Sequence, residues 1–180
     1  MSLPSWKDQL RQVLANLTNP DRGHPRIAIL GIGNPLNGDD AVGGYIADRI
    51  NRRLGSLGRK GSFDLYVANT GPVPENFTGA IRKFSPDLIV MVDAASIDPG
   101  QEPIQWIPLE AIAGFSASTH GMPLSMLANY LVEELKCQIG LIGIQARSTS
   151  PGPTGQSTMT PEVRAMAQKI VRFLARELSR

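Results

Sequence analysis

The sequence of 180 residues lacks the features typical of secreted proteins, of proteins with cysteine-bound metal clusters and of membrane-embedded proteins. Cys137 is its only cysteine, which excludes an intrachain disulfide and a metal site built from several thiolates of this chain. No stretch approaches the roughly eighteen uninterrupted apolar residues of a membrane span. Residues 1–17 interleave charges with apolar side chains and lack the apolar core of a signal peptide. We therefore expect a cytoplasmic protein that does not enter a membrane.

Strong charge of either sign is also missing. Charged residues make up 19% of the chain and the formal net charge is +2. The densest basic group is Arg52, Arg53, Arg59 and Lys60, which is typical of a solvated face rather than of a nucleic-acid surface. We therefore expect no nucleic-acid partner. With 42% hydrophobic residues, a chain of this length can bury a sizeable core, and we expect a single domain over residues 1–180.

The spacing of apolar residues predicts alternating strands and helices. An amphipathic helix is expected over about residues 4–17, on the flank of the domain. Strands are predicted over residues 26–32, 63–68, 87–92, 103–107 and 138–144. Helices are predicted over residues 40–54, 74–84, 123–135 and 160–178, the last with Thr160 as N-cap and Pro161 at its first position. This order predicts an α/β fold, a three-layer αβα sandwich with a mostly parallel central sheet.

The turn after the first predicted strand, GIGNPLNGDD, has glycines like those of a nucleotide-binding loop but lacks the residues that such a loop uses to bind phosphate. Leu36 stands where the Rossmann fingerprint needs a third glycine, and Asp39 and Asp40 stand where a phosphate-binding loop needs Lys and Ser or Thr. Two carboxylates at the start of a helix repel phosphate and favour a cation. One of them could cap the helix, but a cap needs a single Asp, so the second indicates a functional role.

Candidate functional residues follow the predicted strands, where ligands bind in open α/β sheets. Asp39 and Asp40 follow the first strand, Asp93 directly follows the apolar strand 87–92, and His120 lies among small residues before the helix at 123. Each has a plainer interpretation, as a cap or as a structural histidine. Two carboxylates and an imidazole suit a divalent transition metal with open positions. They equally suit acid–base hydrolysis without a metal, and the residues alone leave both readings open.

Three motifs in this order, GIGNPLNGDD, VDAAS and STHGMPLSMLANYL, resemble the hydrogenase maturation endopeptidases, and in particular the type that processes the large subunit of hydrogenase 3. The similarity runs from Ile27 to Gln145. It implies a phosphorylase/hydrolase-like fold and an aspartic-type endopeptidase that removes a C-terminal extension from the precursor of a nickel–iron hydrogenase large subunit after nickel insertion. It further implies that Asp40, Asp93 and His120 contact the metal, and that nickel is recognised on the substrate rather than held permanently.

The hydrolytic step is less clearly marked in the sequence. No motif indicates an activated serine, and Cys137 lies at the end of a predicted helix, away from the strand ends. We therefore take Asp40 and Asp93 as the catalytic residues, with one of them or a metal activating water. Ala41 departs from the family, which commonly has glycine there. If that backbone needs a positive φ, Ala41 costs about 1 kcal/mol and can displace the Asp40 carboxylate.

Two alternative functions remain open at this level. A peptidyl-tRNA hydrolase-like enzyme begins with a similar strand and turn, but the Tyr and the His-Asn pair of that family are absent from LNGDDAVGG. A non-catalytic module could bind a metal or a partner protein through the same acidic rim. The Ser, Thr, Pro and Gly-rich residues 147–159 predict an exposed loop, which serves either as a lid or as a simple connection.

Overall fold

The fold contains one six-stranded sheet in the order β2-β3-β1-β4-β6-β5. A computed structural model describes residues 4–114, 122–149 and 158–180. The strands are β1 (Arg26–Ile32), β2 (Leu57–Lys60), β3 (Phe63–Gly71), β4 (Leu88–Ala95), β5 (Ile104–Pro108) and β6 (Gln138–Gln145). β3, β1, β4 and β6 run parallel to one another, whereas β2 and β5 pair antiparallel at the two edges. The predicted sheet with a parallel centre is confirmed.

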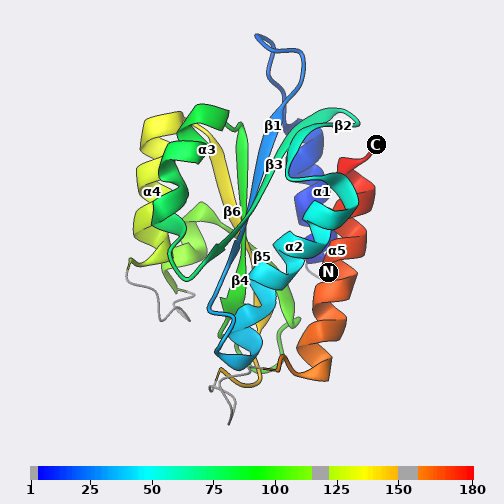
Figure 1. The fold of residues 1–180 in the computed structure, drawn as a ribbon, viewed down its shortest axis with the longest axis vertical. Coiled ribbons are helices and arrows are strands. Elements are labelled where there is room, and N and C mark those ends of the chain that lie inside the picture. Colours follow the sequence, from blue (N-terminus) through cyan, green and yellow to red (C-terminus); the bar gives the residue numbers. More distant parts are fainter. Residues whose placement is uncertain (1–3, 115–121, 150–157) are drawn as a thin grey trace.

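Helices cover both faces of this sheet. They are α1 (Trp6–Asn16), α2 (Val42–Leu54), α3 (Thr78–Phe84), α4 (Leu124–Leu135) and α5 (Pro161–Leu178), with short 3₁₀ turns η1 (Gly38–Ala41), η2 (Pro74–Phe77) and η3 (Leu109–Gly114). Figure 1 shows α3 and α4 on one face and α1, α2 and α5 on the other. The predicted three-layer arrangement is therefore confirmed.

Alternate side chains of the central strands enter two separate cores. Along β1, Ile27 and Ile29 pack with α1, α2 and α5, while Ala28 and Leu30 pack with α3 and α4. All four are fully buried. A strand covered on both faces has no polar side to show, which is why the predicted strands appear in the sequence as continuous apolar runs.

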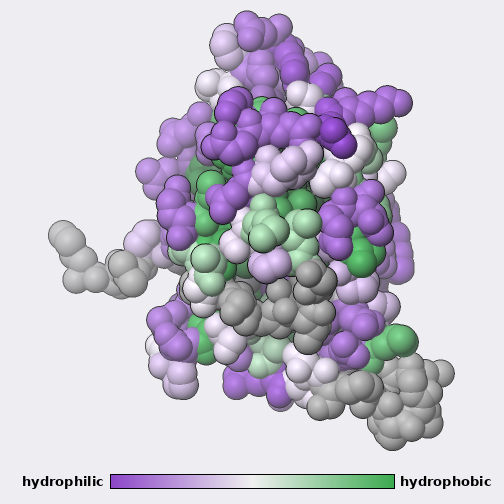
Figure 2. Space-filling view, turned by 90° about the vertical axis from the view of Figure 1, so that its left-hand side faces the viewer, coloured by the Kyte–Doolittle hydropathy of each residue, from purple (hydrophilic) through white to green (hydrophobic). Residues whose placement is uncertain are grey.

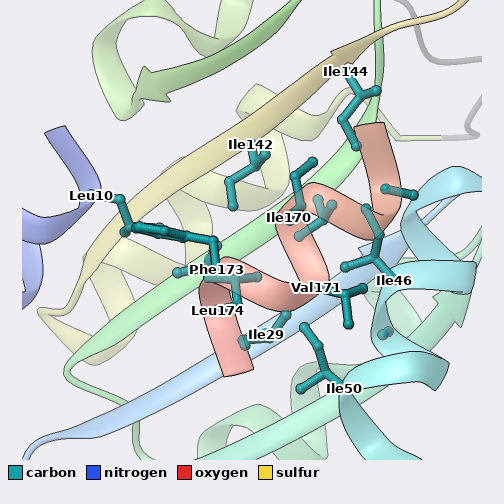
Figure 3. Packing of buried hydrophobic residues seen from close by; sticks show 14 of the residues in the cluster. Leu10, Ile29, Ile46, Ile50, Ile142, Ile144, Ile170, Val171, Phe173 and Leu174 are labelled. Atoms are coloured by element: carbon teal, nitrogen blue, oxygen red, sulfur yellow. The ribbon is translucent and has the colours of Figure 1, made fainter. Parts of the chain in front are cut away.

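Helix α5 provides much of the core that lies between the sheet and the helices α1, α2 and α5. Figure 3 shows Phe173 of this helix on the side of Leu10 of α1 and Val171 on the side of Ile46 of α2, all within one buried cluster. At the start of α5, Thr160 is the N-cap and its hydroxyl accepts a hydrogen bond from the backbone N–H of Val163, as the sequence predicts.

Several element boundaries differ from the predictions. β3 continues to Gly71, and β4 continues to Ala95, so that Asp93 lies within its strand instead of following it. β2 was not predicted, because a four-residue edge strand of Leu, Gly, Arg and Lys carries no alternating apolar pattern. Pro123 is the N-cap of α4 and does not occupy its first turn.

The outer surface of the α3 and α4 layer is mixed in character. Figure 2 shows this face with hydrophilic side chains over its upper part and hydrophobic ones gathered near its middle. Among the described helices, none combines the length and the hydropathy needed to cross a bilayer.

Candidate active site

The candidate site lies where the neighbouring parallel strands β1 and β4 end. The two strands are paired up to Gly31 and Val92. One residue further along β4 stands Asp93, and β1 leads through a short loop into η1, which carries Asp39 and Asp40. The carboxyl ends of parallel strands meet at one edge, so the structure places Asp40 and Asp93 at the same edge of the sheet.

Close packing of α2 brings the two acids toward each other. A Cβ atom added at Gly43 would collide with the carbonyl oxygens of both Ile32 and Val92. Glycine therefore lets the first turn of α2 lie directly on the ends of β1 and β4. The preceding turn η1 contacts β4 as a result, so the Asp40 turn packs against the strand that carries Asp93.

Asp40 is 5% exposed and has one oxygen engaged. Its Oδ2 accepts a hydrogen bond of 2.8 Å from the backbone N–H of Asn34. Gly33 has φ 130°, and a Cβ atom there would collide with the carbonyl oxygen of Asp40, so only glycine allows this approach. Within the described residues no donor bonds to Oδ1, which leaves that oxygen available to a proton, a water or a cation.

Ala41 does not strain this turn. Its φ is −66° and its ψ is −9°, in the right-handed helical region that alanine adopts readily. The positive φ values of the turn fall on Gly33 and Gly38 instead. The condition under which Ala41 would displace the Asp40 carboxylate is therefore not met.

Asp93 lies deeper than predicted. It is 2% exposed and stands opposite Gly143 of β6, inside the paired part of β4. Its Oδ1 accepts a hydrogen bond of 2.8 Å from the backbone N–H of Ala94. The prediction that Asp93 directly follows its strand is wrong, since β4 continues to Ala95, although Asp93 is the first residue of β4 beyond its pairing with β1.

Asp39 has a different role from Asp40. Its fully buried carboxylate accepts hydrogen bonds from the backbone N–H groups of Arg147 (2.8 Å), Ser148 (2.9 Å) and Thr160 (2.7 Å), and one of 2.9 Å from the Thr160 hydroxyl. Its own N–H donates to the Ser148 carbonyl oxygen at 2.7 Å. Asp39 thus joins the residues after β6 to the start of α5.

Hydrogen bonds also set the charge state of Asp39. Burial acts to raise the pKa of its carboxyl group, but the hydrogen bonds from Thr160, Ser148 and Arg147 outweigh this effect, and the pKa lies below its ordinary value of 3.8. Neither η1 nor α2 has a side-chain cap, so the interpretation of Asp39 or Asp40 as a helix cap is wrong.

Asn34 and Thr70 support the edge, and the sequence analysis did not identify them. Besides its backbone bond to Asp40, Asn34 accepts at Oδ1 a hydrogen bond of 2.9 Å from the N–H of Leu36. The hydroxyl of Thr70, which is 3% exposed, donates to the Gly31 carbonyl oxygen at 3.0 Å. An Asn directly before Pro is a known turn former, and this signal could have identified Asn34.

Two sequence predictions fall partly or wholly outside the described residues. His120 belongs to residues 115–121, so its proposed contact with a metal stays a prediction. The same holds for the role of residues 150–157 in the loop 147–159. Within the described ranges, no three His, Cys, Asp or Glu side chains are grouped so as to hold a metal ion. The described part of the site contributes the two carboxylates.

Cys137 lies between α4 and the beginning of β6, at the amino end of that strand and hence away from the candidate site. The thiol is buried, and burial raises its pKa to about 11. A thiol that stays protonated at neutral pH is a poor nucleophile. Of the thiol and the carboxylates considered from the sequence, the carboxylates are the ones that stand at this edge.

Comparisons with known proteins agree with this architecture. Residues 45–177 match the family model of the HycI type, described as hydrogenase maturation protease. The matched range includes Asp93 and begins just after the Asp40 turn. The hydrogenase 3 maturation protease of Escherichia coli K12 is 36% identical over 123 residues, which are 65% of this chain and 70% of that protein.

Two solved structures have the same fold. The crystal structure of the [NiFe] hydrogenase maturation protease HycI from Thermococcus kodakarensis has a TM-score of 0.71 and 33% identity, and the match covers 93% of this chain and 99% of that one. The solution structure of the endopeptidase HycI from Escherichia coli has a TM-score of 0.62 and 28% identity, with 86% and 89% covered. The chain therefore belongs to the family of hydrogenase maturation proteases, which are endopeptidases.

Proposed function

We propose that this protein removes a C-terminal extension from the precursor of a nickel–iron hydrogenase large subunit after nickel has been inserted. Family membership supports the reaction type, and the names of the relatives from Escherichia coli and Thermococcus kodakarensis support the class of substrate. The observation that carries the proposal is the pair of buried carboxylates, Asp40 and Asp93, at one edge of the sheet. A cytoplasmic location is part of the proposal.

In this proposal Asp40 and Asp93 perform an aspartic-type hydrolysis. Cutting a peptide bond requires that a water lose a proton as it attacks the carbonyl carbon, and that the leaving amine gain one. Oδ1 of Asp40 is available to take the proton from water, while Oδ2 is fixed by Asn34. Asp40 can then give this proton to the leaving amine, so that the transfer balances. As a buried carboxylate, Asp93 would attract a positive charge, such as the substrate's metal, more strongly than an exposed one.

Nickel enters the proposal as part of the substrate. The carboxylates of Asp40 and Asp93, with the imidazole of His120, would give the oxygen and nitrogen ligands that suit a divalent transition metal. Recognition of nickel already bound to the precursor would let the protease distinguish a loaded large subunit from an empty one. The metal would then be contacted during recognition and would leave with the product.

The two alternative functions receive no support from the comparisons. The matching family model and the Escherichia coli relative are those of hydrogenase maturation proteases, and the formal net charge of +2 offers a tRNA little electrostatic attraction. A non-catalytic module would bind the precursor and leave it intact, which the following experiment detects.

The test is incubation of a nickel-loaded large-subunit precursor with the wild-type protein, Asp40→Asn or Asp93→Asn, followed by measurement of intact mass. Asn at position 40 keeps an oxygen for the Asn34 N–H, removes the charge and replaces the other carboxylate oxygen with an NH₂ group, which cannot accept a proton from water. We expect the wild type to release a C-terminal peptide, and each variant to be slower by about 10²- to 10⁴-fold, the usual contribution of a general acid or base.

Asp64→Asn is the matched control, because Asp64 stands at the amino end of β3, away from the site. It should cut at the wild-type rate. Nickel-free precursor should stay intact with every protein. An Asp40→Asn protein that cuts as fast as the wild type would remove Asp40 from the mechanism, and an intact loaded precursor after incubation with the wild type would overturn the function.

A further inference from the structure

Two large apolar side chains are exposed beside the candidate site. In the described residues, five large hydrophobic side chains are exposed: Leu36, Leu57, Val73, Met126 and Tyr130. Leu36 is 54% exposed in the loop after β1, and Val73 is 39% exposed just after β3. β1 and β3 are neighbouring parallel strands, so both side chains stand at the edge that carries Asp40.

The loops that carry Leu36 and Val73 begin at one point. Ile32 at the end of β1 pairs with Gly71 at the end of β3. The next residue, Gly33, donates a hydrogen bond of 3.1 Å from its N–H to the Gly71 carbonyl oxygen. Val73 is two residues from this bond and Leu36 is three, so the chain holds both side chains within a short span of the same edge.

The loop under Leu36 is fixed by the candidate catalytic acid itself. Asp40 accepts the Asn34 N–H at Oδ2 (2.8 Å), and the Asn34 side chain accepts the Leu36 N–H (2.9 Å). The Asn34 carbonyl oxygen accepts the Asn37 N–H at 3.1 Å. Leu36 is therefore displayed to solvent from a backbone that is hydrogen-bonded on both sides, at a position determined by Asp40.

We infer that Leu36 and Val73 bind an apolar side chain of the precursor next to the bond that is cut. This inference rests on the proposed function. An endopeptidase must hold the substrate chain on both sides of the reacting carbonyl, and carboxylates alone offer no apolar contact. An apolar pair beside the Asp40 turn gives this contact without changing the charge of the site. Leu36 and Val73 are binding residues in this assignment and take no part in proton transfer.

The test compares the same substitution at two exposed leucines. Leu36→Ser removes the proposed contact, and Leu57→Ser is the matched control, because Leu57 is 65% exposed on the edge strand β2. With nickel-loaded precursor, we expect Leu36→Ser to raise KM about tenfold or more with little change in kcat, the pattern for loss of uniform binding. Val73→Ser should raise KM as well, and Leu57→Ser should leave both constants unchanged.

Further variants separate contact from indirect effects. Leu36→Met keeps apolar volume and should restore a KM close to that of the wild type. In the Asp40→Asn background, where cutting is expected to be slow enough to measure binding, adding Leu36→Ser should raise the Kd for the precursor by the same factor relative to Asp40→Asn alone. If the wild type cuts but Leu36→Ser has the KM of Leu57→Ser, the inference is overturned and the proposed function stands. If the wild type neither cuts nor binds the loaded precursor, both are overturned.

Discussion

Replacing Asp39 with asparagine should lower the free energy of unfolding by about 3 kcal/mol at neutral pH. The carboxylate accepts bonds from Arg147 and Ser148 at Oδ2 and from Thr160 at Oδ1. Asparagine keeps only one accepting oxygen, and its NH₂ group must then face donors on the other side. If the Arg147 and Ser148 N–H groups lose their acceptor, each costs about 1 to 3 kcal/mol.

The pH dependence gives an independent check on the same carboxylate. The pKa of Asp39 is below 3.8 in the folded protein, so the charged form is favoured by folding. This stabilisation is complete above the unfolded value of 3.8 and is lost as the pH falls through the lower folded pKa. Asp39→Asn has no such dependence. The stability difference between the two proteins should therefore be constant near neutral pH and should shrink below about pH 4.

Equilibrium unfolding in urea, followed by circular dichroism between pH 7 and pH 3, measures both effects. Asp64→Asn is the control, because the Asp64 carboxylate is about one-third exposed and pairs with Arg26 at 3.7 Å, a contact worth less than about 1 kcal/mol. An Asp39→Asn protein within about 0.5 kcal/mol of the wild type at pH 7, or a difference that does not shrink in acid, would refute the assigned role of Asp39.

Two further predictions concern packing and the lone thiol. Gly43→Ala should destabilise the fold by about 1 to 3 kcal/mol, because the added Cβ meets two strand carbonyl oxygens. Gly79→Ala in α3 is the control: its Cβ meets no atom within 4 Å, and the change should stabilise the fold slightly. Urea unfolding of both variants checks this, and equal effects would contradict the packing of α2. Cys137 should react with iodoacetamide at pH 8 far more slowly in the folded protein than in urea, since burial raises the pKa of its thiol to about 11. Mass spectrometry measures the labelling, and equal labelling in both conditions would contradict the burial of the thiol.

Local sequence was enough to predict most of the elements. The apolar runs at 26–32, 87–92 and 138–144 each form a central strand, because a strand covered on both faces must be apolar throughout. The Thr160-Pro161 pair begins α5 as predicted, since the cap is formed by neighbouring residues. In contrast, β2 is a strand only because it pairs with β3, and its own residues show no strand pattern.

The roles of the adjacent acids Asp39 and Asp40 could not be predicted from the local sequence. The sequence alone placed Asp39 and Asp40 in a turn after a strand and indicated that two acids exceed the need for a cap. Only the tertiary structure separated their roles, because the donors to Asp39 come from residues more than 100 positions away, while Asp40 binds Asn34 within its own turn. The sequence by itself predicted which residues are candidates for the chemistry. Long-range hydrogen bonds decided that Asp39 is a structural anchor, and the packing of α2 on β4 placed Asp40 at the candidate site.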